Sequence, residues 1–346
     1  STYDAGTTTQ LMWGARSDVG CVRPHNEDSY LVQSPLFCVC DGMGGHAAGE
    51  VASSIAVETI AKTAPQSADA ARLAAAVEAA NAAVIEAALN GLGKPGMGCT
   101  ATCAYIENDT LAIAHVGDSR AYLLHEGTLI RVTRDHSYVE ELVDAGEITA
   151  DEARVHPNRS VITRALGSDP AMYADHFTLH IEEGDRLILC SDGLSSMIPD
   201  SDIENIATQS STAQICVDNL VDAALAAGGH DNVTVVVVDL VDDGVMREAQ
   251  RVRRRNITIA AILALVFVLA AGIWAYTGVT GSYYLGTYQG NVAVWRGLPG
   301  KPLGLKLHWL ESETSIKLSD LPEDTQNRLK AGIPQTSVDD AQDTIS

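Results

Sequence analysis

Residues 36–49 read LFCVCDGMGGHAAG, and the pattern of this stretch recurs in the rest of the chain. A short apolar run from Leu36 to Cys40 ends in the carboxylate of Asp41, and a cluster of glycines follows. This pattern predicts a buried strand that carries one charged side chain at its end. The glycines allow the backbone to turn sharply and to approach a bound ion. Because Asp-Gly is also the commonest hairpin-turn pair, the stretch alone leaves an ordinary turn open.

The same pattern occurs three more times in the chain. Asp118 follows an apolar strand predicted over 110–116, Asp192 follows another over 185–190, and Asp231 precedes a Val-rich strand over 233–240. Four converging carboxylates without cations would repel one another. Mn²⁺ and Mg²⁺ prefer such oxygen ligands, so the pattern predicts a metal cluster. Two ions roughly 3.5–4 Å apart can hold a bridging hydroxide and polarise a phosphoryl group for in-line attack.

A charged segment precedes the first of these strands. Arg23, Glu27 and Asp28 stand close together without any apolar periodicity, and taken alone they are typical of a solvated loop. Beside a metal cluster, Arg23 is a candidate phosphate-binding residue, because a guanidinium binds phosphate oxygens through two parallel hydrogen bonds.

The intervening segments predict the frame of the domain. Ala-rich stretches at 49–63 and 68–90 have the apolar spacing of amphipathic helices packed on a sheet. The glycine-rich stretch at 91–98 lacks the Lys-Ser/Thr ending of a phosphate-binding loop, so we interpret it as a connector. Residues 137–165 predict short polar helices in a surface insertion.

Composition excludes one class of function and constrains the compartment. The formal net charge of −22 argues against a nucleic-acid surface, which requires clustered Lys and Arg. All seven cysteines precede residue 217 and none forms a CxxC pair. We interpret them as buried, reduced thiols of a cytosolic domain rather than disulfides or a zinc site.

A second apolar feature predicts a membrane anchor. Residues 257–276 read ITIAAILALVFVLAAGIWAY, which is long enough to cross about 30 Å of hydrocarbon. Four arginines at 251–255 precede it, and aromatic residues suited to the opposite interface follow. We therefore expect a single-pass protein of the cell membrane. Its expected parts are a cytoplasmic catalytic domain over 11–242, a basic linker over 243–256, a transmembrane helix over 257–277, and a small extracytoplasmic domain with a disordered tail over 278–346.

At this point the chain resembles the metal-dependent protein phosphatases of the protein phosphatase 2C type, and most closely the membrane-anchored serine/threonine phosphatases of actinobacteria. The resemblance covers about residues 13–241. It is carried, in order, by Asn26-Glu27-Asp28, Asp41-Gly42-Met43-Gly44-Gly45, Gly117-Asp118-Ser119-Arg120, Ser191-Asp192-Gly193 and Asp231-Asn232. It implies an α+β fold, namely an αββα four-layer sandwich of two antiparallel sheets flanked by helices. It also implies two ions of Mn²⁺ or Mg²⁺, with a third in some bacterial members.

The resemblance further implies a role for each residue of these motifs. Asp41 bridges two metals, the carbonyl of Gly42 ligates one of them, and Asp192 and Asp231 complete the first metal. Glu27 and Asp28 hold the second largely through water, and Arg23 binds the phosphate. The third metal falls to Asp118 with Asp192, and Ser160 contributes there. Residues 137–165 correspond to the mobile flap beside the active site.

One position departs from the animal form of the pattern and puts the general acid in doubt. A histidine directly after Asp-Gly is replaced here by Met43. Two candidates for this role stay open: His46, which would orient or protonate the substrate, and a metal-bound water, which would protonate the leaving alkoxide.

The expected activity is hydrolysis of phosphoserine and phosphothreonine by direct attack of hydroxide. The partners that the resemblance implies are phosphorylated proteins, including membrane-anchored serine/threonine kinases that control cell division and wall synthesis, and phosphopeptide-binding proteins. Two alternatives stay open: a membrane-tethered scaffold that has lost catalysis, and a phosphatase of small metabolites.

Overall fold

The computed structural model describes residues 1–8, 10–45 and 48–346, and it divides into two compact units, Ser1–Glu248 and Ala249–Ser346. The first unit contains two antiparallel sheets, with strand orders β1-β2-β12-β11-β8-β9 and β10-β7-β6-β4-β3; β5 (Gly98–Cys99) pairs with β4. The first sheet consists of β1 (Thr2–Thr7), β2 (Leu11–Asp18), β12 (Val233–Leu240), β11 (Arg186–Cys190), β8 (Arg120–His125) and β9 (Thr128–Arg131). The second consists of β10 (Asp175–His180), β7 (Thr110–Val116), β6 (Ala101–Glu107), β4 (Leu36–Met43) and β3 (Asp28–Gln33).

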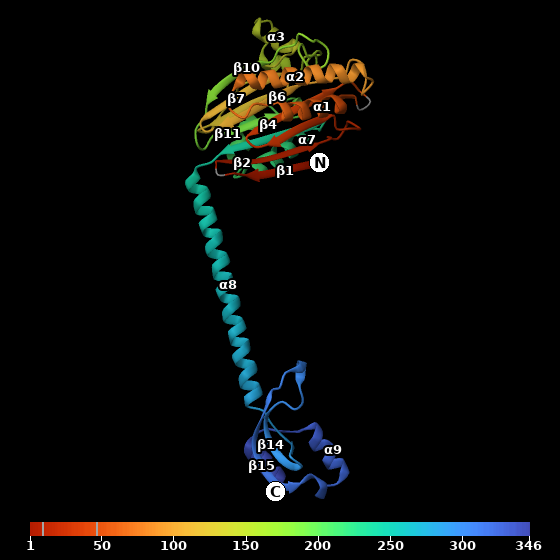
Figure 1. Ribbon diagram of the computed structural model, residues 1–346. Coiled ribbons are helices and arrows are strands. Elements are labelled where there is room, and N and C mark those ends of the chain that lie inside the picture. Colours follow the sequence, from red (N-terminus) through yellow and green to blue (C-terminus); the bar gives the residue numbers. More distant parts are fainter. Residues whose placement is uncertain (9, 46–47) are drawn as a thin grey trace. The chain divides into compact units, whose positions relative to one another are not determined.

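Two pairs of helices accompany the sheets (Figure 1). α1 (Ala48–Thr63) and α2 (Ala70–Leu89) pack on the second sheet, and α6 (Asp200–Gln209) and α7 (Ala213–Ala226) pack on the first. In α2 the buried residues Leu73, Val77, Ala80 and Val84 repeat at helical spacing, as the sequence predicts. The predicted α+β fold is confirmed.

Three apolar cores hold these elements together. One lies between α1, α2 and the second sheet, another between α6, α7 and the first sheet. The third joins the two sheets and contains Phe37 and Val39 of β4 with Val236 and Val238 of β12. Alternate residues of β4 therefore serve different cores, because Cys38 and Cys40 face the helices. Six of the seven cysteines are buried free thiols as predicted, whereas Cys21 is exposed.

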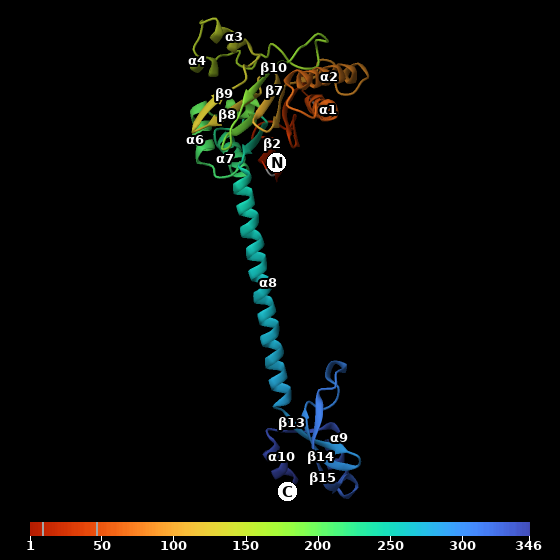
Figure 2. The same ribbon diagram turned by 60° about the vertical axis from the view of Figure 1, so that its left-hand side comes forward.

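The insertion after β9 forms two short helices, α3 (Tyr138–Asp144) and α4 (Ala150–Arg154), which contact each other (Figure 2). Ser137 caps the first, and Thr149 with Glu152 forms a capping box on the second. A third short helix, α5 (Asp192–Ser195), follows β11 directly.

The second unit begins within α8 (Asp243–Thr280). The segment 248–280 of this helix is long and apolar enough to cross a membrane. A four-stranded sheet of order β15-β14-β13-β16 follows, with β13 (Tyr283–Tyr288), β14 (Asn291–Gly297), β15 (His308–Lys317) and β16 (Ile333–Gln335). Short 3₁₀ turns occur at Pro302–Gly304 and Leu318–Asp320. The helices α9 (Glu323–Ala331) and α10 (Val338–Ile345) complete this unit.

The structure differs from the sequence predictions at several elements. Strands β1, β2, β10 and β15 were not predicted, because their apolar residues are few or lack a clear alternation. The juxtamembrane linker is part of the continuous helix α8. Where the sequence predicts a disordered tail, the structure has α10: Ser337 caps it, and Ala341 is buried against the small core of this unit.

Candidate metal centre

Asp41 and Asp28 lie directly opposite each other on the neighbouring strands β4 and β3. Residues paired in this way point to the same face of a sheet. Asp28 is buried, and its Oδ2 accepts a hydrogen bond of 2.6 Å from the hydroxyl of Thr234 on β12. Since β12 belongs to the other sheet, this bond joins the two sheets at the edge of the site.

Backbone packing around Gly42 explains why a glycine follows Asp41. A Cβ atom there would lie 2.0 Å from the carbonyl oxygen of Gly49 and 2.5 Å from that of Glu27. The Gly42 N–H donates to the same Glu27 carbonyl at 3.1 Å. Any side chain would push the segments apart, so glycine keeps the backbone of this turn beside the carboxylates.

Asp118 and Asp192 bring two further carboxylates to the same place. Asp118 follows β7 after Gly117, whose φ of +108° favours glycine, and Asp192 begins α5 after β11. One carboxylate oxygen from each of Asp41, Asp118 and Asp192 lies within 4.8 Å of the other two. Three of the four aspartates that were singled out at strand ends are thus brought together.

Asp231, which precedes β12 of the first sheet, is brought close to Asp192 by a tight backbone contact. A Cβ on Gly193 would lie only 1.9 Å from the carbonyl oxygen of Asn232, so glycine lets the segments carrying Asp192 and Asp231 meet. Asp231 Oδ1 lies 3.3 Å from Nε of Arg23, whose side chain is 56% exposed. The guanidinium is therefore held at the rim of the site while remaining accessible to a ligand.

Asn232 organises the loop that carries the other predicted residues. Its Oδ1 accepts from the N–H of Glu27 at 2.9 Å, and its Nδ2 donates to the carbonyls of Val19 and His25, each at 2.9 Å. This amide therefore fixes residues 19–27. Glu27 is not one of the three grouped carboxylates. Its carboxyl carbon approaches Gly49 so closely that an added Cβ there would lie 2.9 Å from it.

The electrostatics of the site favour bound cations. Burial, with the neighbouring negative charges, raises the pKa of Asp28 to about 7 and that of Asp231 to about 6. The pKa values of Asp41 and Asp118 are raised well above the ordinary range for the same reasons. Among the described residues, none forms a hydrogen bond with the buried Oδ1 atoms of Asp28, Asp118 and Asp192. Hard divalent ions such as Mn²⁺ and Mg²⁺ fit this set of oxygen ligands.

A cavity of about 1010 Å³ lies beside the carboxylates, between the sheets and the insertion at 137–165. Asp118, Asp192, Asp231 and Arg23 line it, and Ser160 is an exposed residue of its wall. Arg154 of α4 donates to the carbonyl oxygens of Ser195 at 2.7 Å and Ser196 at 3.4 Å, which ties the insertion to the segment after Asp192. His46 lies outside the described residues.

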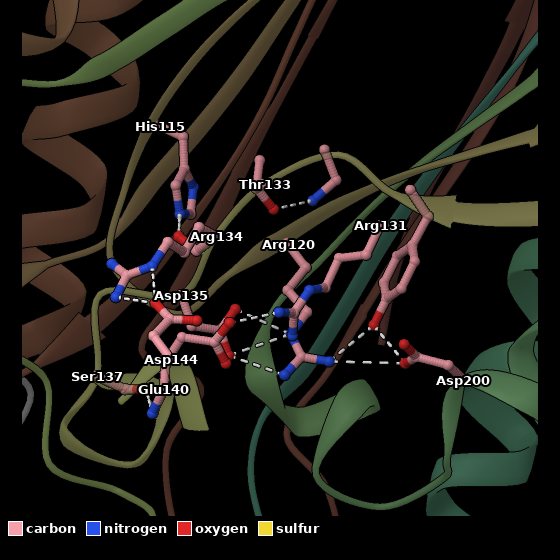
Figure 3. A network of polar contacts seen from close by, with 12 residues as sticks. His115, Arg120, Arg131, Thr133, Arg134, Asp135, Ser137, Glu140, Asp144 and Asp200 are labelled. Carbon is pink, nitrogen blue, oxygen red and sulfur yellow. Dashed lines mark hydrogen bonds and ion pairs between the residues drawn. The ribbon is translucent and has the colours of Figure 1, made fainter. Parts of the chain in front are cut away.

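A network of ion pairs supports the segment after Asp118 (Figure 3). Arg120 donates from Nε and Nη2 to the carboxylate of Asp135 at 2.8–3.2 Å, and both side chains are largely buried. Its other nitrogen donates to the hydroxyl of Tyr122, which donates to Asp200. Further pairs join Arg131 to Glu140 and Arg134 to Asp144 at the base of the insertion.

Sequence reasoning assigned no role to several residues that hold this site together. Arg120 and Asn232 occur within the recognised motifs, so their positions carried a signal. Thr234 and Asp135 carried none, since a buried strand threonine and a loop aspartate are ordinary residues.

Comparisons with known proteins show which family the chain is similar to. The sequence profile of the family described as protein phosphatase 2C matches residues 14–233. The serine/threonine protein phosphatase PstP of Mycobacterium tuberculosis is 33% identical over 97% of this chain and 79% of its own length. A crystal structure of that phosphatase, PstP/Ppp, matches with 42% identity and a TM-score of 0.64, over 67% of this chain and 99% of the solved chain. The PstP catalytic domain in complex with two manganese ions matches with 40% identity and a TM-score of 0.63, over 67% of this chain and 99% of the solved chain.

Proposed function

This chain belongs to the protein phosphatase 2C family, and on that premise we propose how its residues hydrolyse phosphoserine and phosphothreonine in proteins. It is a metal-dependent serine/threonine protein phosphatase that uses Mn²⁺ or Mg²⁺. The single observation that carries the assignment of the site is the group of Asp41, Asp118 and Asp192, whose carboxylate oxygens lie within 4.8 Å of one another.

The proposed metal ligands divide between the two sheets. Asp41, Asp192 and Asp231 would hold the first ion. Asp41 would also contact the second ion, which Glu27 and Asp28 would hold largely through water, and the carbonyl of Gly42 would ligate one of the two. When bound, the two ions supply Lewis acidity and a nucleophile from water at neutral pH. Asp118 and Asp192 would take a third ion, with Ser160 of the cavity wall beside them. The buried oxygens of Asp28, Asp118 and Asp192 that lack a partner among the described residues support this assignment.

Arg23 is proposed to bind the phosphoryl group of the substrate. Its Nε lies 3.3 Å from Asp231, while its side chain is 56% exposed at the cavity rim. The ion pair orients the guanidinium, and the nitrogens that do not face Asp231 can donate to phosphate oxygens. His46 is proposed to orient the substrate or protonate the leaving oxygen.

The finer architecture and the location of the protein are also proposals. We infer an αββα four-layer sandwich, which the three separate apolar cores support. The residues 257–277 of α8 would span the membrane, and the arginines at 251–255 would keep the catalytic domain over 11–242 in the cytoplasm. Residues 278–346 would lie outside.

The substrates would be phosphoproteins modified by membrane-anchored serine/threonine kinases, together with those kinases and phosphopeptide-binding proteins.

Turnover of a phosphothreonine peptide by the full chain in nanodiscs tests the site. Activity should require Mn²⁺, vanish with chelator and fall by several orders of magnitude in Asp41→Asn. Asp109→Asn is the matched control, because Asp109 lies at the turn between β6 and β7, about 20 Å of strand away from the site. Equal loss in both variants, or undiminished turnover of Asp41→Asn, would overturn the assignment. A folded chain that binds Mn²⁺ without turnover would instead indicate a scaffold.

A further inference from the structure

The connection between β14 and β15 in the second unit has an unusual position. Residues 298–307, which we call the exit loop, read LPGKPLGLKL. The N–H of Gly297, just before the loop, donates to the carbonyl of Ser282 at 2.6 Å, and Ser282 is two residues beyond the end of α8. The exit loop therefore leaves the sheet where the chain leaves the helix. The turn at Gln289–Gly290 lies at the opposite end of β13 and β14, about 20 Å away.

The exit loop exposes large apolar side chains. Leu303 is 100% exposed and Leu305 is 58% exposed, and Leu298 adds to them. None belongs to the small core of this unit, which is built around Leu285, Val294 and Leu329. Leu303 has a φ of +54°, a left-handed conformation that leucine rarely adopts. Two turn hydrogen bonds, from Gly304 to Lys301 and from Leu305 to Pro302, close the backbone around it.

The charge around the exit loop is opposite to that of the rest of the protein. No Asp or Glu occurs between residues 249 and 310, whereas Lys301 and Lys306 lie in the loop; Arg296, just before the loop, forms an ion pair with Glu311 at 3.5 Å. From residue 311 to the end, eight acidic residues face three basic ones. Both lysines are exposed, and neither is ion-paired within the described part of the chain. The aromatic residues Tyr283 and Trp309 stand at the same end of the sheet.

We propose that the exit loop docks on the outer surface of the membrane that α8 spans, with Leu303 and Leu305 among the lipid chains and Lys301 and Lys306 on anionic headgroups. Exposed leucines interleaved with lysines suit this interface, and Tyr and Trp gather at the same depth in membrane proteins. Anionic lipid is favoured over a protein partner because the loop starts at the point of exit from α8. This inference rests on the proposed membrane span.

Fluorescence quenching in the full chain tests the docking. In a Cys21→Ser background the other native thiols are buried, so a single environment-sensitive label can be placed at Leu303→Cys in nanodiscs of phosphatidylcholine and phosphatidylglycerol. We expect this label to be quenched by bromine on the lipid chains and shielded from aqueous iodide. Gln289→Cys, exposed at the far turn, is the aqueous control, and Val266→Cys within α8 is the lipid control.

The outcomes separate the loop from the helix. Quenching at Val266 together with an aqueous signal at Leu303 would overturn the docking and leave the span intact. No lipid quenching at Val266 would refute the span, and the docking with it. Shielding of Leu303 from iodide without lipid quenching would indicate a protein contact, which also overturns the proposal.

A charge series tests the contribution of the headgroups. Lys301→Gln and Lys306→Gln should each lower the ratio of docked to free loop about fivefold on phosphatidylglycerol, because a basic residue near an anionic surface contributes on that scale. Lys317→Gln is the matched control, since Lys317 pairs with Asn291 at the far end of the sheet. An equal effect of Lys317→Gln would refute a role of the two loop lysines.

Discussion

Replacing Asp28 by asparagine should stabilise the metal-free phosphatase domain, and more strongly at high pH. Asp28 is buried, its Oδ1 has no hydrogen-bond partner within the described part of the chain, and burial raises its pKa to about 7 from an ordinary value of 3.8. The folded state therefore binds a proton that the unfolded state has lost between these two pH values. Stability from the protonated carboxyl is present below pH 3.8 and is lost as the pH rises through 7.

The size of the effect follows from the shift in pKa. Each pKa unit corresponds to 1.36 kcal/mol, so ionising Asp28 costs the folded state about 4 kcal/mol at pH 8. At pH 5 the same balance costs roughly 2 kcal/mol. The advantage of Asp28→Asn should thus grow by about 2 kcal/mol between these conditions. Asparagine keeps an acceptor for the hydroxyl of Thr234 and adds no charge.

Urea unfolding of residues 1–248 with chelator measures this difference. The solved PstP catalytic domain matches 67% of this chain, and residues 1–248 form one compact unit whose only tryptophan is Trp13, packed against Phe37 between the sheets. Comparing the two proteins at each pH cancels the titration of groups remote from Asp28. Mn²⁺ should reverse the order, because only the wild type keeps the carboxylate. A difference that stays constant with pH in chelator, or that shrinks as the pH rises, would refute the reasoning.

Three further predictions concern the residues around the site. Asp135→Asn should destabilise the domain by about 3 kcal/mol in urea unfolding, because it leaves the buried Arg120 guanidinium poorly compensated; a loss below 1 kcal/mol would contradict this. Burial lowers the pKa of His115 from 6.5 to about 4, so stability should be lost as the pH falls through 6.5, by up to about 3 kcal/mol near pH 4, and His115→Gln should flatten that slope in unfolding titrations. Arg154→Ala removes the hydrogen bond to Ser195, so amide exchange over α4 should accelerate; unchanged exchange would show that this bond does not hold the insertion.

The sequence predicted the elements whose patterns are strong. The strand ending at Asp41 and the helices α1, α2 and α7 were found because apolar residues recur at the spacing of their secondary structure. Strand β2 was missed, since its residues LMWGARSD carry charge and glycine and are buried through pairing with β1 and β12 and packing against α7. Long-range pairing of that kind is invisible in a local window.

The sequence singled out the aspartates that the structure brings together, but it did not indicate the residues that support them. Asp41, Asp118 and Asp192 each end an apolar run, which is a local signal, and the structure brings their oxygens together. The hydroxyl of Thr234 and the amide of Asn232 act across more than 200 residues of sequence, on Asp28 and Glu27. No spacing rule indicates such partners, because their geometry exists only after the two sheets have packed.

The hydrogen bond between Thr234 and Asp28 has a mechanical consequence. It crosses the seam between the sheets at one end, where carboxylates from both sheets also meet. A sliding motion of one sheet past the other, even by a fraction of a residue, would break this bond and separate the carboxylates at once. The apolar contacts of Phe37, Val236 and Val238 between the two sheets resist such sliding. The packing of these side chains therefore determines how precisely the carboxylates of the site are positioned.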